Sequence, residues 1–222
     1  AGDPLLDRTV ALKLPKPHVL LTAELRQRFL REAQAASNLH HPHIAQIYDA
    51  SNSEATCYIA TEYCDGGSLA EWLCRNEDLL DSQTMAMLIS RLSDGVHYAH
   101  RAGILHRDLK PSNILLQSNP SERIGKIPYT AKVADFGLAK LETRIDEMTV
   151  SGAIVGSIHY MAPEQAMGNN ADLDARTDVY ALGVILYRLL AGVLPFDNES
   201  SHLKLLRDIV ENETTSIHAI QP

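Results

Sequence analysis

The stretch ILHRDLKPSNILL, residues 104–116, gathers two cations, an acid and an amide between apolar flanks. Asp108 has the chemistry to accept a proton or to orient a hydroxyl, and Lys110 reaches the same volume if the backbone is extended. Asn113 offers an amide oxygen, a ligand type that Mg²⁺ prefers. Each residue alone fits an ordinary surface loop with salt bridges, but the whole string predicts a catalytic loop.

A second stretch, KVADFGLAK at residues 132–140, supplies another carboxylate. Asp135 stands at the exit of a short apolar run, where a carboxylate can bind a metal in a cleft. Phe136 is expected to be buried, and Gly137 lets the chain change direction. An Asp-Phe-Gly tripeptide alone is a weak signal, and its position shortly after Asn113 gives it weight.

The rest of the chain divides into a small part with strands and a larger helical part. RTVALKLPKP (8–17) alternates apolar and polar residues like a strand that carries Lys13, and the paired glycines of CDGG (64–67) favour a turn or linker. Apolar periodicity and turn residues predict the following segments: helices over 22–39, 68–75, 82–102 and 175–191, and strands over 56–63, 114–116 and 131–134. Clefts between two such parts are usual ligand sites.

These motifs together resemble the eukaryotic-type protein kinase family. The matching stretches are VALK (10–13), FLREAQAASNLHHPHI (29–44), HRDLKPSN (106–113), DFG (135–137), APE (162–164) and RTDVYALGVILYRLLAG (176–192). The run HRDLKPSN resembles the serine/threonine branch, and HPHIAQIYD (42–50) with YMAPEQ (160–165) is most similar to bacterial members. The resemblance implies an α+β, two-lobed kinase fold: a β-rich N-lobe over 1–63, a hinge over 64–67 and a mainly helical C-lobe over 68–222.

The same resemblance implies a nucleotide site. Lys13 is expected to bind the α- and β-phosphates of ATP and to pair with Glu32. The adenine pocket is expected to have Ala11 above, Leu115 below, backbone groups of Glu62 and Cys64 at its edge, and Thr61 at its inner end.

For phosphoryl transfer, the resemblance implies that Asn113 and Asp135 hold Mg²⁺, that Asp108 positions the substrate hydroxyl, and that Lys110 neutralises charge on the moving group. Such a transition state is loose, so catalysis consists mostly of positioning and charge stabilisation. His106 is expected to bond the backbone near Asp135.

A regulatory arrangement is also implied. Arg107 precedes the catalytic aspartate, and in relatives such an arginine often binds a phosphorylated activation loop. Thr149 and Ser151 lie in that segment, so we expect self-phosphorylation in trans there to order it; the alternative is that both are solvated hydroxyls. Ser157, in GSIHYMAPE (156–164), stands where threonine is commoner and keeps a hydroxyl for Lys110 and Asp108.

The composition limits the classes of molecule that the chain is expected to bind. The chain has 222 residues, 45% of them hydrophobic, and a formal net charge of −8, which argues against a nucleic-acid surface. The apolar stretch 179–196 contains Arg188 and a proline, so it predicts a buried helix and no membrane segment. Three cysteines without metal spacing favour a reducing compartment, so we expect cytoplasmic residence. Protein substrates are what the kinase resemblance implies.

Several features depart from the family pattern. Twelve residues precede Lys13, fewer than the roughly twenty that the glycine-rich hairpin needs, so we expect that loop and the terminal helices to be missing, which makes the chain truncated at both ends. This leaves two alternatives: a fragment of an active kinase, or a non-catalytic pseudokinase or scaffold. We also expect Glu164 to lack an arginine partner, residues 117–131 to form a surface hairpin, and HHPH (40–43) to bind no zinc.

Overall fold

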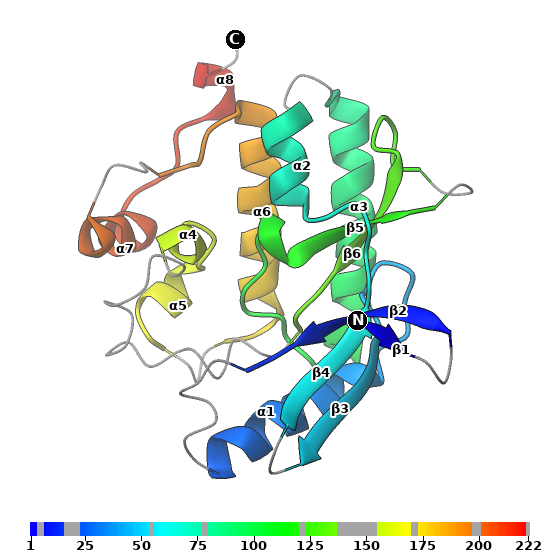
Figure 1. Ribbon diagram of the computed structural model, residues 1–222. Coiled ribbons are helices and arrows are strands. Elements are labelled where there is room, and N and C mark those ends of the chain that lie inside the picture. Colours follow the sequence, from blue (N-terminus) through cyan, green and yellow to red (C-terminus); the bar gives the residue numbers. More distant parts are fainter. Residues whose placement is uncertain are drawn as a thin grey trace.

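The computed structural model describes residues 1–3, 7–15, 23–53, 56–76, 80–119, 123–136, 155–169, 173–196 and 201–220. Its N-terminal part is a four-stranded antiparallel sheet with one helix. The strands are β1 Gly2–Asp3, β2 Arg8–Lys13, β3 Ile47–Ser53 and β4 Thr56–Glu62, in the order β1-β2-β4-β3. Helix α1, Ala23–Ser37, packs against β3. The sheet and α1 together form one end of the molecule (Figure 1).

Helix α1 forms because its apolar residues recur on one face. Phe29, Ala33 and Ala36 are buried at the spacing that an amphipathic helix requires. Phe29 and Ala33 pack against Cys57 and Ile59 of β4. The predicted helix over 22–39 is therefore confirmed as Ala23–Ser37, while residue 22 lies outside the described residues.

The larger part is built on two long helices that lie side by side, α3 Ser82–Arg101 and α6 Ala175–Ala191 (Figure 1). Their buried faces share one core with α2, Leu69–Asn76, and with the hairpin of β5 Ile114–Ser118 and β6 Tyr129–Val133. Helix α6 ends at Gly192, whose φ of 73° lies in the left-handed region that glycine adopts without strain. No helix within the described ranges combines the length and the apolar character needed to cross a membrane.

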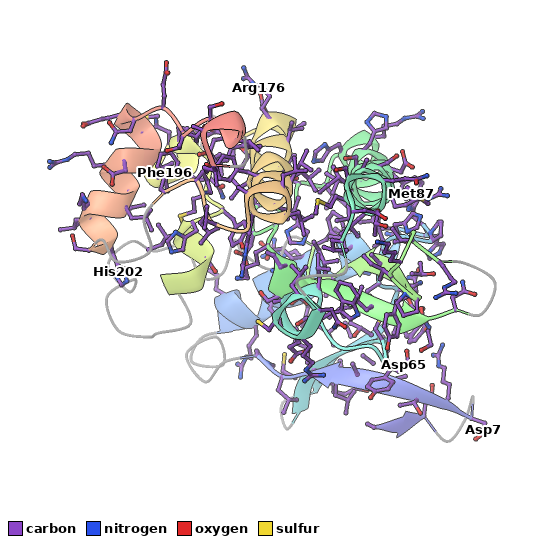
Figure 2. All side chains as sticks on the ribbon, turned by 90° about the horizontal axis from the view of Figure 1, so that it is seen from above. Asp7, Asp65, Met87, Arg176, Phe196 and His202 are labelled. Atoms are coloured by element: carbon purple, nitrogen blue, oxygen red, sulfur yellow. The ribbon has the colours of Figure 1, made fainter. Side chains whose placement is uncertain are left out.

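The remaining helices are the short helices α4 Val155–Ile158, α5 Pro163–Ala166 and α8 Ile217–Ile220, and the longer α7 His202–Glu211. Helix α8 packs against α6, and α7 packs against α4 and α5. Ile158 and Phe196 form a separate small core with Leu205 and Ile209 of α7. Seen from above, Phe196 and His202 lie far from Asp7 in the small sheet (Figure 2).

Two backbone crossings fasten the sheet to the helical part. After β4, Gly66 N–H donates to Leu116 O at 2.8 Å, and Leu116 N–H donates to Gly67 O at 2.9 Å. A Cβ on Gly66 would come within 2.8 Å of that carbonyl oxygen, so the close approach requires glycine. After α1, Ala45 N–H donates to Val133 O and Val133 N–H donates to His43 O, each at 2.9 Å.

The hairpin expected at 117–131 is only partly a surface feature. Strands β5 and β6 extend into it, but Ile124 is 1% exposed and Ile127 is fully buried in the main core. Lys126 N–H donates to Thr84 Oγ at 3.1 Å, which fastens the turn to the start of α3. The expectation of a surface insertion is therefore wrong for these residues, because the two isoleucines give the turn an apolar side that must be covered.

Candidate active site

A buried carboxylate holds the loop at residues 106–113 in place. Asp178 of α6 is completely buried; its Oδ2 accepts from His106 N at 2.9 Å and its Oδ1 accepts from Arg107 N at 2.7 Å. His100 of α3 adds a bond from Nε2 to Asp178 Oδ2 at 2.6 Å. Burial alone would raise the pKa of Asp178, but the hydrogen bond from His100, the nearby His106 and the backbone donors together lower it. The carboxylate is therefore ionised and works as an anchor.

The anchor stabilises an uncommon backbone conformation. Arg107 has a φ of 68°, in the left-handed region that residues other than glycine seldom occupy. Two consecutive backbone N–H groups, of His106 and Arg107, meet the same carboxylate only with the chain turned this way. The side-chain amide of Gln165 adds a bond from Nε2 to Arg107 O at 2.7 Å.

His106 connects this loop to the strand that carries the second carboxylate. It is fully buried; its Nε2 donates to Ala134 O at 2.7 Å and its Nδ1 accepts from Asp108 N at 3.2 Å. These partners require the tautomer with hydrogen on Nε2. Phe136 packs edge-on against the imidazole, with ring centroids 4.8 Å apart. The predicted bond of His106 to the backbone beside Asp135 is confirmed.

Two side chains contact Asp108, and a third contacts one of these two. Lys110 Nζ lies 2.6 Å from Asp108 Oδ2 and donates to Ser157 Oγ at 2.5 Å. Asn113 Nδ2 donates to Asp108 O at 2.8 Å and to Asp108 Oδ2 at 3.0 Å. The predicted contact of Ser157 with Lys110 is confirmed. Both Asp108 and Lys110 remain partly exposed, with 27% and 19% of their side chains accessible, so a substrate can reach them.

A second ion pair joins the small sheet to the helical part. Lys13 Nζ, from β2, lies 2.8 Å from Oδ2 of Asp135, the residue that follows Ala134 after β6. Asp135 has a φ of 66°, a second non-glycine residue in the left-handed region. The expected pairing of Lys13 with Glu32 stays a prediction, since the ion pair that the structure gives for Lys13 is with Asp135.

The donor atoms fit a magnesium ion that is completed by other ligands. Asn113 uses its amide nitrogen on Asp108, which leaves its amide oxygen for a cation, and Asp135 offers carboxylate oxygen. Both are hard oxygen ligands of the kind that Mg²⁺ takes, usually together with phosphates and water. No cluster of three or more His, Cys, Asp or Glu that could hold a metal by itself occurs within the described ranges.

The residues predicted for the adenine pocket lie where the two parts meet. Ala11 of β2 pairs in register with Thr61 of β4, and the next position of β4 is Glu62. Leu115 of β5 forms a bridge with the segment that follows β4. Cys64 is 9% exposed, and burial is the main cause that raises its pKa to about 12. The structure thus brings these residues to one junction, and their contact with a nucleotide stays a prediction.

The side chain of Glu62 forms an ion pair that no pattern in the sequence predicts. Lys132 Nζ of β6 lies 3.0 Å from Glu62 Oε1, and the two side chains are only 13% and 14% exposed. Gln46 N–H donates to Glu62 Oε2 at 3.2 Å. This buried pair fastens β4 to β6 at the junction. The only sequence signal for this ion pair is the lysine before the Asp-Phe-Gly stretch, and that signal does not indicate which acid the lysine contacts.

Two further hydrogen bonds hold the segment 162–165, which lies next to the candidate site. Glu164 Oε1 accepts from the Thr177 hydroxyl at 2.6 Å, so the glutamate expected to lack an arginine has a different partner. Gln165 Oε1 accepts from Ala162 N at 3.1 Å. Thr149, Ser151 and Gly137 lie outside the described residues.

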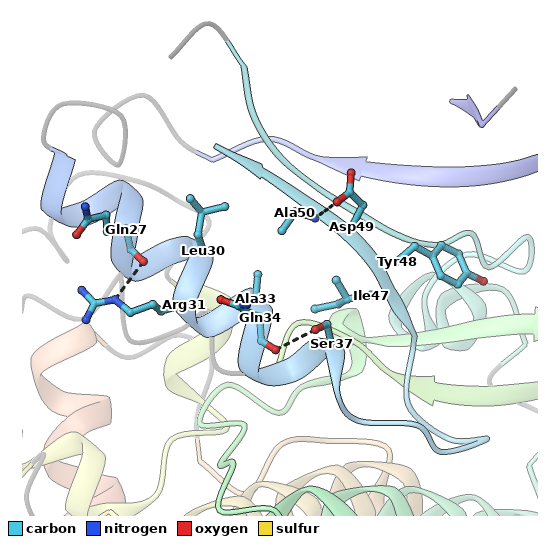
Figure 3. A pocket seen from close by; sticks show the side chains of 10 residues that line it. All are labelled: Gln27, Leu30, Arg31, Ala33, Gln34, Ser37, Ile47, Tyr48, Asp49 and Ala50. Atoms are coloured by element: carbon cyan, nitrogen blue, oxygen red, sulfur yellow. Dashed lines mark hydrogen bonds between the residues drawn. The ribbon is translucent and has the colours of Figure 1, made fainter. Parts of the chain in front are cut away.

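A pocket of about 680 Å³ lies elsewhere, between α1 and β3 (Figure 3). Leu30, Ala33 and Ile47 supply apolar side chains, and Gln27 and Arg31 lie toward one end of it. None of the residues described above at Asp108 and Asp135 lines this pocket. We therefore take the junction, with its convergent charged groups, as the candidate active site.

Comparison with known proteins agrees with this geometry. A model of the protein kinase domain matches residues 6–221. PrkC, a serine/threonine-protein kinase of Bacillus subtilis strain 168, is 38% identical over 203 residues, which are 90% of this chain and 29% of that protein. Serine/threonine-protein kinase pkn3 of Myxococcus xanthus is 40% identical over 201 residues, 88% of this chain and 35% of that protein.

Among solved structures, the crystal structure of the kinase domain of Mycobacterium tuberculosis PknI is similar, with a TM-score of 0.68 and 28% sequence identity. The match covers 99% of this chain and 73% of that one. The chain spans 29% to 35% of the length of the two curated relatives above.

Proposed function

Because this chain belongs to the protein kinase family, we propose that it transfers the γ-phosphoryl group of ATP to serine or threonine hydroxyls of proteins. The observation that carries the proposal is the position of one lysine: Lys110 Nζ contacts both the carboxylate of Asp108 and the hydroxyl of Ser157. A carboxylate that can accept from the substrate hydroxyl and a cation beside it are what phosphoryl transfer to an alcohol requires, and the Ser157 hydroxyl helps to hold that cation in place.

In the proposed reaction, the substrate hydroxyl occupies the space beside Asp108 and donates a hydrogen bond to that carboxylate. A carboxylate is a weak base for an alcohol, so Asp108 orients the nucleophile and takes its proton late. As the O–P bond to the acceptor forms and the bond to the β-phosphate oxygen breaks, Lys110 offsets the negative charge of the moving group. Asn113 keeps Asp108 oriented through its amide nitrogen.

The proposal also gives the second ion pair, Lys13 with Asp135, a role in binding the nucleotide. Lys13 exchanges its contact with Asp135 for phosphate oxygens of ATP and, as expected from the family resemblance, pairs with Glu32. Asp135 and Asn113 then provide oxygen ligands for Mg²⁺, which when bound neutralises part of the triphosphate charge. Ala11, Leu115, Thr61 and backbone groups at 62 and 64 would surround the adenine.

Regulation by self-phosphorylation is part of the proposal. A phosphate that a neighbouring copy places on Thr149 or Ser151 would form charge-assisted hydrogen bonds to the guanidinium of Arg107 in the same chain and so order the segment. Mass spectrometry after incubation with MgATP tests this step. An unmodified segment in a fully active enzyme would contradict regulation by self-phosphorylation.

We also propose a reducing, cytoplasmic setting, which suits three cysteines that form no disulfide.

The test of the main proposal is an assay with radiolabelled ATP, Mg²⁺ and a generic protein substrate, followed by phosphoamino-acid analysis. We expect label on serine and threonine, and a loss of at least about 100-fold in rate for Asp108→Asn. Asp174→Asn, at the half-exposed N-cap of α6, is the matched control and should keep the rate. Equal labelling by the Asp108→Asn and unaltered chains, at equal thermal stability, would show that the signal does not come from this site and would favour a scaffold role.

A further inference from the structure

A second pocket, of about 350 Å³, lies where the loop after α1 meets α3. Its lining combines histidine, arginine and tyrosine side chains with one acid: His41, Pro42, His43, Arg91, Asp94, His97, Tyr98 and Arg101. None of these residues takes part in the proposed phosphoryl transfer. Three residues of the HHPH stretch, at positions 41–43, line the pocket, and the proposed transfer provides no role for them.

The loop side of this pocket is rigidly built. His43 is 2% exposed, and its Nδ1 bonds Ala131 O of β6 at 3.0 Å. Gly95 of α3 allows the loop to approach, since a Cβ there would come within 3.0 Å of His43 O. His41 packs against Tyr98, with ring centroids 5.3 Å apart and planes 32° from each other. The pocket wall is therefore formed before any ligand arrives.

The contacts of His41 determine which of its two ring nitrogens carries the hydrogen. Its Nδ1 accepts a hydrogen bond from His43 N–H at 3.2 Å. In the neutral ring the hydrogen must then be on Nε2, which makes Nε2 a donor. Burial, chiefly, lowers the pKa of His41, and the nearby His43 acts in the same direction while Asp94 opposes it. The ring is therefore a hydrogen-bond donor in either protonation state.

The helix side contributes a concentration of positive charge. Positions 91, 94, 98 and 101 are three or four residues apart and so share one face of α3. Arg91 and Arg101 carry two permanent positive charges against the single negative charge of Asp94, and His97 can add another. The lining is thus net positive with every histidine neutral, on a chain whose formal net charge is −8.

We propose that this pocket binds a phosphate monoester carried on a serine or threonine side chain of a protein. Arginine guanidinium groups match phosphate oxygens in pairs, and the Nε2–H of His41 adds a donor. A phosphoryl group offers three strong acceptor oxygens to these donors, whereas a carboxylate offers two. The rings of Tyr98 and His41 offer apolar surface to the peptide that carries the phosphate.

Zinc is the competing ligand for a histidine-rich stretch, and the geometry does not support it. No group of three or more metal-ligating side chains comes together in the part of the chain that the structure describes. His43 uses Nδ1 on a backbone oxygen, and His41 uses Nδ1 on a backbone N–H. The arginines beside them would also repel a cation.

The experiment measures binding to the whole chain by fluorescence anisotropy, without ATP, at low ionic strength. The probes are a labelled pentapeptide with central phosphoserine between alanine and glycine residues, the same peptide with serine, and the same peptide with glutamate; inorganic phosphate is a competitor. We expect the phosphopeptide to bind about tenfold or more tighter than the other two. Equal binding of all three peptides, or displacement by inorganic phosphate at the same concentration as by unlabelled phosphopeptide, would overturn a protein-borne ligand.

Variants locate the binding within the pocket. Arg91→Gln and Arg101→Gln should each weaken phosphopeptide binding about tenfold, while Asp94→Asn should tighten it about threefold. Arg75→Gln, at an exposed position of α2, is the charge-matched control and should change nothing. All four side chains are exposed, so each variant should keep the thermal stability of the parent. An unchanged affinity for the Arg91 and Arg101 variants would refute the site, whether or not the chain is catalytically active.

Discussion

Replacing Asp178 by asparagine tests the idea that one buried carboxylate holds the catalytic loop. Asp178 accepts three hydrogen bonds, from His100 Nε2 and from the backbone N–H groups of His106 and Arg107. Asparagine has the same size, so the change leaves no cavity. Its amide, however, presents one oxygen and one N–H₂ group to three donors.

The cost follows from that mismatch. If the amide oxygen takes the place of Oδ2, the N–H₂ group faces the N–H of Arg107, and that buried donor loses its acceptor at a cost of about 1–3 kcal/mol. The two remaining bonds lose their charged acceptor, and charge-assisted bonds are roughly twice as strong as neutral ones. We therefore expect the free energy of unfolding to fall by about 3 kcal/mol for Asp178→Asn, with phosphoryl transfer lost as the loop leaves its conformation.

Chemical denaturation followed by circular dichroism measures this quantity, and Asp174→Asn on the same helix is the control. Asp174 is half exposed and caps α6 by accepting from Arg176 N, a role that asparagine fills equally well, so its cost should stay below about 1 kcal/mol. The hydrogen bonds lower the pKa of Asp178, so its contribution is present above the unfolded pKa of about 3.9 and is lost as the pH falls further. A deficit for Asp178→Asn that equals the control, or that does not shrink below about pH 4, would refute the reasoning.

Three further predictions concern stability. Lys132→Met leaves Glu62 buried without its cation and should cost about 3 kcal/mol, while the double change Glu62→Gln with Lys132→Met should cost less; a double-mutant cycle in denaturant measures the difference, and additive losses would contradict a coupled pair. Gly125→Ala should be more destabilising than Gly103→Ala, because both have positive φ but only the first places a Cβ against a packed side chain; equal melting temperatures would count against this. Burial next to Arg188 lowers the pKa of His159, so the neutral form is favoured by folding, and stability should decline as the pH falls below about 6.5, less steeply for His159→Gln; parallel pH profiles of the two chains would exclude this histidine as a cause.

The sequence predicted the parts of the fold that rest on periodicity and motif order. The helix expected over 175–191 is Ala175–Ala191, and that expected over 82–102 is Ser82–Arg101. The kinase fold, the serine/threonine branch and the similarity to bacterial members are confirmed by the relatives and by the matching structure. These succeeded because an apolar stripe and a run of catalytic residues are local patterns that a single chain displays directly.

Other features were not predictable because their cause is distant in the sequence. Strand β3, Ile47–Ser53, reads as polar in its second half and becomes a strand by pairing with β4. The turn holding Ile124 and Ile127 was expected at the surface, and only the position of α3 shows that it is covered. His100 is separated from Asp178 by 78 positions, and no pattern in either helix names the other as its partner.

The two ion pairs of the candidate active site fit the proposed reaction, because they hold its parts together before any nucleotide binds. Lys110 with Asp108 and Lys13 with Asp135 each combine one cation with one carboxylate, so two acids can lie in the same site without an uncompensated charge. The second pair is the more exposed of the two, with 39% and 34% of its side chains accessible, and water screens it. Exchanging that pair for phosphate oxygens and Mg²⁺ therefore costs little, whereas breaking the first would unseat Asn113 and Ser157 as well. The nucleotide end of the site is thus the exchangeable one, and the acceptor end is the preorganised one.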